Sequence, residues 1–255
     1  MSDALFPACD GVEPVTLALR RASVAAGHVL WHTWANSPGP AREWLQRSVQ
    51  QLQLIAAARL PHRVEVSVPE GYAYYGVYPE HYLEAAKDYH SSVREENTVV
   101  CLGLRSIGSS LSAAVAAALE ELGRRVTSWT LRPRGHPFCR SPRIDAQLRR
   151  QLLDARDAHF LIIDEGPGIS GSSFGGTIAM LRSLEVPKDR IALFPSWDPD
   201  GSTLRSAEAR QHWPEHRRFS RTFEQVWLEE ATAQVALSQR STRAAPQARC
   251  SSCSL

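Results

Sequence analysis

The sequence lacks the features that would place it in a membrane or in an export pathway. No apolar run among its 255 residues approaches the roughly 20 that a membrane-spanning helix needs. The first residues, Met1 to Gly11, have neither the basic start nor the apolar block of a secretory signal. We therefore expect a cytoplasmic protein with no membrane partner.

Cysteine is scarce and irregularly placed. The five cysteines are Cys9, Cys101, Cys139, Cys250 and Cys253, and no regular spacing suggests a disulfide framework. The last two form a single C-x-x-C in a polar tail. Because a zinc site needs four ligands and no second cysteine pair occurs elsewhere, we interpret this spacing as accidental.

A large charge of either sign is also missing. The net charge of +2 gives no global basic field that would attract nucleic acid. The apolar content of 43% and the charged content of 22% are those of an ordinary globular protein. The length suits one large domain, or one domain with appendages.

The first 95 residues predict a helical segment that leads into an aromatic hood. We expect a short helix over Leu17–Val29, a break at 38–40, and an amphipathic helix over Arg42–Leu60. The inward face of the longer helix is predicted to carry Leu45, Val49, Leu52 and Ala56.

Two histidines, His28 and His32, have the i, i+4 spacing of a helical metal-binding pair. No acidic residue stands at a matching spacing, so the sequence favours two incidental histidines. We predict no direct protein ligand for a metal.

Four tyrosines gather between Pro69 and Pro79, after a predicted strand over Arg63–Ser67. They are Tyr72, Tyr74, Tyr75 and Tyr78. Two interpretations remain open: an aromatic wall for a flat ring such as a base, or ordinary packing of a cap over the core. The next helix is expected over Glu80–His90, with Tyr82, Ala85, Ala86 and Tyr89 on its inner side.

Residues 96–237 have the pattern of an α/β core. Thr98–Gly103 is a continuous apolar run, typical of a strand buried on both faces. Ser109 is expected to cap a helix that stops at Gly123, and Val126–Leu131 is the next strand. The crossover of such a β-α-β unit is right-handed, which predicts a parallel sheet flanked by helices.

The segment Arg132–Arg140 is basic and holds two prolines and a glycine, which predict a loop without regular structure. It leaves the carboxyl end of a parallel strand, where open α/β sheets place their ligands. Further on we expect a helix over Ala146–Asp157, a strand over Ile191–Pro195 and one or two helices over Glu208–Gln239. Residues 238–255 predict a disordered tail.

The most informative stretch runs from Phe160 to Thr177. Four apolar residues lead into Asp164 and Glu165, a loop of glycine, proline and serine follows, and a helical pattern then resumes. The inner face of that helix is Phe174, Ile178, Leu181 and Leu184. Backbone N–H groups at the helix start favour an anion, and the carboxylates can accept hydrogen bonds from sugar hydroxyls. A ribose phosphate is the ligand that this pattern indicates.

Three features stand at strand ends: the turn 105–108, the basic segment 132–140 and the acidic loop after Ile163. Over about Asn97 to Ser196 this order resembles the type I phosphoribosyltransferases. The Asp-Glu-Gly-Pro-Gly version of the loop is similar to that of an uncharacterised bacterial branch of this family. The resemblance implies transfer of 5-phosphoribosyl from phosphoribosyl pyrophosphate (PRPP) to an acceptor, with Mg²⁺ and release of pyrophosphate. The expected partners are these two small molecules, with a homodimer left open.

The resemblance also implies roles for residues. Asp164 and Glu165 would hold the ribose hydroxyls, and the hood would set the acceptor through Tyr72, Tyr74, Tyr75 and Tyr78. The 5-phosphate would be wrapped by Gly168, Ile169, Ser170, Gly171, Ser172 and Ser173. The pyrophosphate and Mg²⁺ would face Arg105, Ser106, Ile107 and Gly108. The departing charge would be neutralised by Arg132, Arg134 or Arg140.

The chain departs from the family pattern at its second acid, and either Asp164 or Glu165 can be aligned as the first. Two other functions therefore stay open. One is a non-catalytic sensor that binds PRPP or a nucleotide. The other is a dinucleotide-binding oxidoreductase, because Gly166 to Gly171 matches G-x-G-x-x-G. Pro167 inside the turn and the two preceding carboxylates count against the second alternative.

Overall fold

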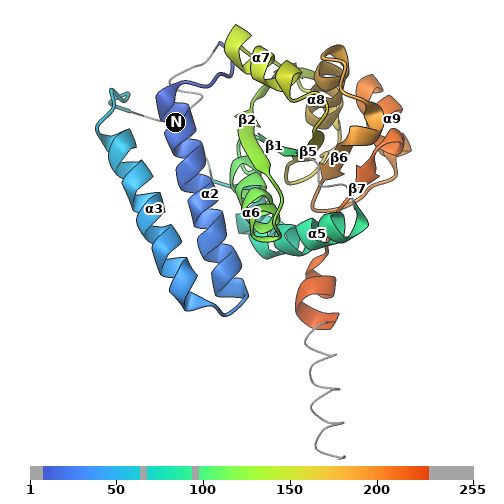
Figure 1. Ribbon diagram of the computed structural model, residues 1–255. Coiled ribbons are helices and arrows are strands. Elements are labelled where there is room, and N and C mark those ends of the chain that lie inside the picture. The colour runs from blue at the N-terminus through green and yellow to red at the C-terminus, as the bar shows by residue number, and fades with distance from the viewer. Residues whose placement is uncertain (1–7, 64–67, 94–97, 230–255) are drawn as a thin grey trace, which may run out of the picture.

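The computed structural model describes residues 8–63, 68–93 and 98–229 (Figure 1). The predicted strand over Arg63–Ser67 lies almost wholly outside the described residues, and so does the predicted tail at 238–255. Within the described part, no helix is both long enough and apolar enough to cross a membrane.

The centre of the fold is a five-stranded parallel sheet. Its strands are β1 (Val99–Leu104), β2 (Val126–Leu131), β5 (His159–Ile163), β6 (Ile191–Phe194) and β7 (Arg217–Arg218). Their spatial order is β2-β1-β5-β6-β7, and every neighbouring pair is parallel. The predicted α/β class with a parallel sheet flanked by helices is confirmed.

Both faces of the sheet are covered, as the continuous apolar strands predict. Side chains alternate along each strand, so Val100 and Leu102 enter one core while Val99 and Cys101 enter the other. The first core is closed by α7 (Ala146–Asp154) and α8 (Ser172–Ser183), and the second by α5 (Pro79–Ser92) and α6 (Gly108–Glu121). The predicted inner faces of α5 and α8 are buried.

Helix α6 forms the predicted crossover between β1 and β2, but Ser109 does not cap it. The N-cap residue is Ile107, and Ser109 lies inside the first turn. In α7 the cap is Asp145, whose Oδ1 accepts the Leu148 N–H at 2.6 Å.

The helices α2 (Pro14–Trp34) and α3 (Pro38–Ala56) lie side by side beyond α6 (Figure 1). Both begin earlier than predicted; α2 also runs on beyond Val29 to Trp34, whereas α3 ends at Ala56, before the predicted Leu60. The prolines expected to break the chain at 38–40 instead begin α3, because a proline in the first helical turn removes only an N–H that has no partner within the helix.

The face that α3 turns to α2 differs from the predicted one. Leu45, Val49 and Leu52 are 54%, 45% and 52% exposed, whereas Ala41, Ser48 and Ile55 are buried. Small residues let the two helices approach closely, and Ser48 donates a hydrogen bond to the Ala22 carbonyl at 3.2 Å. The buried face of α3 is therefore the one that allows close approach to α2, and the most apolar stripe of the helix stays exposed.

The basic segment is not irregular. It forms a hairpin of β3 (Pro133–His136) and β4 (Cys139–Pro142), which contradicts the predicted loop. Pro133 and Pro142 are paired at the open end, and Pro137 lies in the turn, so no proline interrupts the middle of a strand. Gly135 adopts a φ of +115° opposite Arg140.

The region after β6 also differs from the predicted helices. Between Glu208 and Glu229 the predicted helices are replaced by the short elements α9 (Ala207–His212), η3 (Trp213–Glu215), β7 and η4 (Glu224–Glu229), and residues 230–239 of that prediction lie outside the described residues. Two further short helices are η1 (Lys188–Arg190), before β6, and η2 (Gly201–Thr203), after it. Pro214 lies in the first turn of η3, directly after the end of α9. Buried Trp213 anchors this turn through a bond from Nε1 to the Pro199 carbonyl at 3.2 Å.

Candidate functional site

The order of the strands creates a crevice between β1 and β5. The chain leaves β1 toward β2 on one side of the sheet and leaves β5 toward β6 on the other. Open α/β sheets bind ligands at such a switch point, outside the carboxyl ends of the strands. Here the loops after β1 and β5 line a cleft of about 910 Å³.

The carboxylates of Asp164 and Glu165 both line this cleft. Their backbone is fixed from three sides: the Asp164 N–H donates to the Phe194 carbonyl, the Tyr82 hydroxyl donates to the Asp164 carbonyl at 2.7 Å, and the Ser196 N–H donates to the Glu165 carbonyl. The acids therefore stand on a rigid strand end.

Asp164 is the more perturbed of the two acids. Burial raises the pKa of its carboxyl from the usual 3.8 to about 7, with a smaller upward contribution from Glu165. Three contributions lower the pKa: the backbone N–H of Glu165, which donates to Oδ1 at 2.9 Å, the backbone N–H of Gly108, and the positive charge of Arg140. Burial thus makes Asp164 easier to protonate than an ordinary aspartate.

Glu165 lies beneath the hood. Burial and the nearby carboxylate of Glu70 both raise its pKa. Gly71 permits this contact, because a Cβ at Gly71 would lie 2.7 Å from the Glu165 carboxyl carbon. The first turn of α4 (Glu70–Tyr74) therefore lies directly against the acid.

The loop from Gly168 to Gly171 leads into the amino end of α8. Gly168 and Gly171 have φ values of +55° and +68°, and the N-cap residue Gly171 offers no side-chain cap, although the Ser170 hydroxyl accepts the Ser172 N–H at 3.3 Å. The first-turn N–H groups of α8 thus favour an anion. Gly168 and Ser173 line the cleft, and Arg140 approaches the Ser173 hydroxyl at 3.5 Å.

The other residues of the predicted phosphate loop, Ile169, Ser170 and Ser172, make contacts that fix the conformation of the loop. Ser172 is buried and its hydroxyl donates to the Pro137 carbonyl at 2.7 Å. The carbonyls of Ile169 and Ser170 accept the N–H groups of Arg205 and Ser206. The Ile169 side chain is 70% exposed.

The turn after β1 lines the cleft directly beside the acids. Arg105, Ser106 and Ile107 line it, and the peptide bond between the first two is cis. Gly108 packs so closely on β5 that a Cβ there would lie 2.6 Å from the Ile163 carbonyl oxygen.

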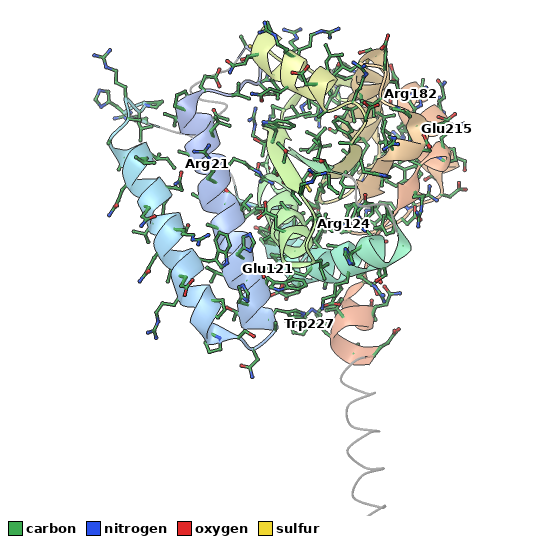
Figure 2. The ribbon with its side chains drawn as sticks, viewed as in Figure 1. Arg21, Glu121, Arg124, Arg182, Glu215 and Trp227 are labelled. Atoms are coloured by element: carbon green, nitrogen blue, oxygen red, sulfur yellow. The ribbon has the colours of Figure 1, made fainter. Side chains whose placement is uncertain are left out.

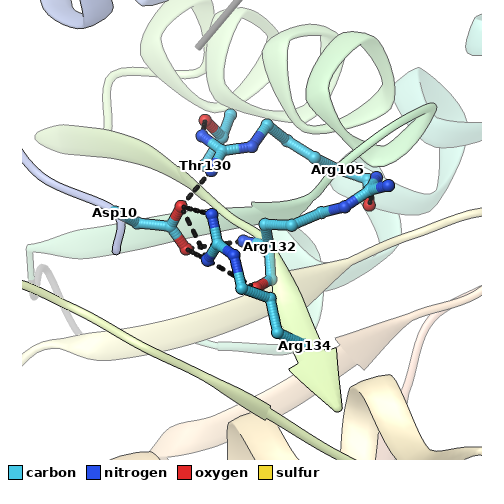
Figure 3. Close-up of polar contacts among 5 residues, drawn as sticks. All are labelled: Asp10, Arg105, Thr130, Arg132 and Arg134. Carbon is cyan, nitrogen blue, oxygen red and sulfur yellow. Dashed lines mark hydrogen bonds and ion pairs between the residues drawn. The ribbon is translucent and has the colours of Figure 1, made fainter. Parts of the chain in front are cut away.

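Three of the four predicted arginines converge on Asp10, a buried residue that sequence reasoning missed (Figure 3). The guanidinium groups of Arg105 and Arg134 both bind its carboxylate, and the Arg132 N–H donates to Oδ2 at 2.7 Å. The Arg132 side chain donates to the Arg105 carbonyl at 3.1 Å. A lone aspartate far from the motifs gave no signal in the sequence. Arg140 is the predicted arginine that lines the cleft without contacting Asp10.

The four tyrosines do not form one wall. Tyr75 lines the cleft, while Tyr72 lies against α6 with its hydroxyl 2.6 Å from that of Ser110. Burial raises the pKa of Tyr72. Tyr74 is 72% exposed, and Tyr78 packs against His81, Phe223 and Trp227.

Other aromatic groups complete the cleft near Tyr75. They are His81, Trp197 and Phe223. Among the described residues, Nε2 of buried His81 has no hydrogen-bond partner, and burial lowers the pKa of its imidazole. Of these three, Trp197 had a usable signal, because it directly follows the carboxyl end of a predicted parallel strand.

No protein-family model matches this chain, and a search of curated proteins finds no significant similarity. The assignment of function therefore depends on the geometry and chemistry of the cleft.

Proposed function

We propose that the protein has a type I phosphoribosyltransferase fold, binds PRPP with Mg²⁺ in this cleft, and transfers phosphoribosyl to an acceptor. One observation carries the proposal: two carboxylates at a strand end and the uncapped amino end of a helix line the same cleft. A ribose phosphate offers hydroxyls to the first and an anion to the second.

In this proposal the ribose 2- and 3-hydroxyls donate to Asp164 and Glu165. The 5-phosphate accepts from the first-turn N–H groups of α8, from Ser173 and from Arg140. The side-by-side placement of acid and anion sites matches the short distance between the hydroxyls and the 5-phosphate of one ribose.

The pyrophosphate end lies toward the 105–108 turn. The Asp10 carboxylate binds the guanidinium groups of Arg105 and Arg134 and accepts the Arg132 N–H. Two guanidinium charges against one carboxylate leave this cluster with a net positive charge beside the cleft. Mg²⁺ is held mainly by PRPP, and the hard oxygen atoms of Asp164 and Glu165 suit it as neighbours. The bound ion supplies positive charge that stabilises the departing pyrophosphate.

The reaction breaks the bond from ribose C1 to the pyrophosphate oxygen, which leaves with the electron pair, and forms a bond from C1 to the acceptor. Tyr75, Trp197 and Phe223 supply aromatic surface for a flat acceptor. Any proton that the incoming group loses passes to the departing pyrophosphate or to solvent.

A calorimetric titration with PRPP and Mg²⁺ tests the binding site. The double change Asp164→Asn with Glu165→Gln should weaken binding more than about 30-fold, because two charged acceptors of hydroxyl protons are lost. Arg140→Ala should weaken it about 10-fold. Asp157→Asn, an acid at the second pocket far from the cleft, is the matched control and should bind as the wild type does. Unchanged affinity in the double variant would refute the proposal.

A non-catalytic sensor of PRPP is the second candidate. It is favoured by the ion pairs that hold the Arg105 and Arg134 side chains at Asp10, away from a direct contact with pyrophosphate. Pyrophosphate release across a panel of bases separates the two: binding without turnover supports the sensor. Binding of NAD(P) with indifference to PRPP would instead support the dinucleotide enzyme.

A further inference from the structure

A cluster of histidine and glutamate lies on the opposite end of α6 from the cleft. His28 and His32 project from the last turns of α2, and Glu120 and Glu121 end α6. Figure 2 labels Glu121 beside α2. The acidic partner that was absent from the local sequence around the histidines is thus supplied by a helix about 90 residues further along the chain.

The cluster has the donor atoms and the spacing of a metal site. His28 Nδ1 lies 2.7 Å from Glu121 Oε1, and His32 Nε2 lies 3.1 Å from the same oxygen. One ligand atom from each of the three residues falls within 4.8 Å of the others. Tetrahedral zinc, with bonds of about 2.0–2.1 Å, places its ligand atoms about 3.3 Å apart, so small rotations of the side chains suffice.

The second nitrogen of His28 is already held as in a metal site. Nε2 lies 2.7 Å from Glu120 Oε2, which is the carboxylate contact that orients a metal-bound imidazole and makes it a better ligand. The ring also stacks on Trp44 of α3, with centroids 3.7 Å apart and planes inclined by 6°. Its tilt and its rotation are therefore both fixed before any ion arrives.

The charges around His28 favour a dication. Two carboxylates face one imidazole that is only 2% exposed. The buried guanidinium of Arg20 offsets part of the charge of Glu120, but its own hydrogen bonds go to Ser128 and to the Ser109 carbonyl.

We propose that His28 Nδ1, His32 Nε2 and Glu121 bind one Zn²⁺, with Glu120 as the outer partner of His28. Three protein ligands leave a fourth position for water, and His32 and Glu121 are partly exposed, so the ion has a path from solvent. The ion would fasten α2 to α6. This proposal is independent of PRPP binding.

Titration of the metal-depleted full-length chain with Zn²⁺ against a chromophoric chelator tests the site. The wild type should bind one ion, and the ion should raise the melting temperature. His32→Gln and Glu121→Gln should each raise the dissociation constant more than about 100-fold, because loss of an outer partner alone costs roughly 10–100-fold. Glu120→Gln should fall within that smaller range.

Two controls exclude other zinc ligands. His212→Gln changes a second group of potential ligands, His212, Glu215 and His216, and Cys250→Ser with Cys253→Ser removes the C-x-x-C. Both control variants should bind zinc as the wild type does. Co²⁺ bound in place of zinc should give the d–d absorption bands of tetrahedral coordination, without a thiolate charge-transfer band. Absence of binding by the wild type, or a loss confined to the control variants, would overturn the proposal.

Discussion

At the scale of single residues, Asp164 has the clearest consequence for stability. Its folded-state pKa of about 7 lies above the usual value of 3.8 that the unfolded chain approaches. The folded state therefore binds the proton more tightly. This contribution to stability is fully present below about pH 4 and is lost as the pH rises through about 7.

Asp164→Asn should therefore stabilise the fold more at high pH than at low pH. Asparagine keeps the oxygen that accepts the Glu165 N–H but cannot ionise. Urea unfolding at about pH 5 and about pH 8 should show that the stability gain of the variant grows by roughly 2 kcal/mol over this interval. Asp157→Asn, a change at an exposed acid, is the control for the loss of one negative charge. A gain of the same size at both pH values would show that Asp164 is not buried as described.

At the scale of elements, the contact between α2 and α6 depends on one glycine. A Cβ at Gly27 would lie 2.5 Å from the Ala113 carbonyl oxygen in the backbone of α6. Since backbone cannot rotate away, Gly27→Ala should force the helices apart and destabilise the fold by about 1–3 kcal/mol, despite alanine's better helix propensity.

Gly39→Ala is the matched control, because nothing lies within 4 Å of a Cβ at Gly39 in α3. Thermal unfolding should show a clear drop in midpoint for the first variant and none for the second. Equal midpoints would mean that α2 and α6 are not in close contact.

Helices and strands could be predicted where a local sequence pattern determined them. The β1-α6-β2 unit and the strand–loop–helix around Asp164 follow from apolar runs and glycine punctuation, and both are confirmed. The hairpin at 133–142 was missed because its prolines mark the ends and the turn of paired strands, and pairing is not visible in a local pattern. The inward face of α3 was wrong because close packing, which depends on the partner helix, decided it.

The candidate site was predictable only in part, for a related reason. Asp164, Glu165, Gly168 and Ser173 lie in one short stretch after a single strand, so the sequence brings them together. His81, Trp197 and Phe223 come from separate elements and meet only through the tertiary fold. The partners of Arg105 and His28 likewise lie about 90 residues away in the chain.

At the scale of the whole molecule, burial is concentrated in the sheet and thins out toward α3. All residues of β1 are buried and β5 lies beside it in the centre, whereas α3 packs chiefly on α2 and exposes most of its surface. The backbone hydrogen bonds of a helix that packs on one side only can open without unfolding of the rest of the protein.

Hydrogen exchange followed by mass spectrometry should therefore rank these segments. Peptides that cover Val99–Leu104 and His159–Ile163 should exchange slowest, at the rate of global unfolding, and peptides from Pro38–Ala56 should exchange well before them. Saturating Zn²⁺ should slow exchange in α2, and it should slow β5 as well, because bound zinc raises the free energy of global unfolding. Equal protection of α3 and β1 would contradict this description.

The position of Asp10 has a consequence for the order of events during synthesis. Its carboxylate needs Arg105, Arg132 and Arg134, and its backbone pairs with that of Arg143 and Asp145. At about 5–20 residues per second, the ribosome makes the last of these roughly 7–27 seconds after Asp10 itself. The segment around Asp10 can therefore make none of its contacts with Arg143 and Asp145 until most of the α/β core up to that point has been synthesised.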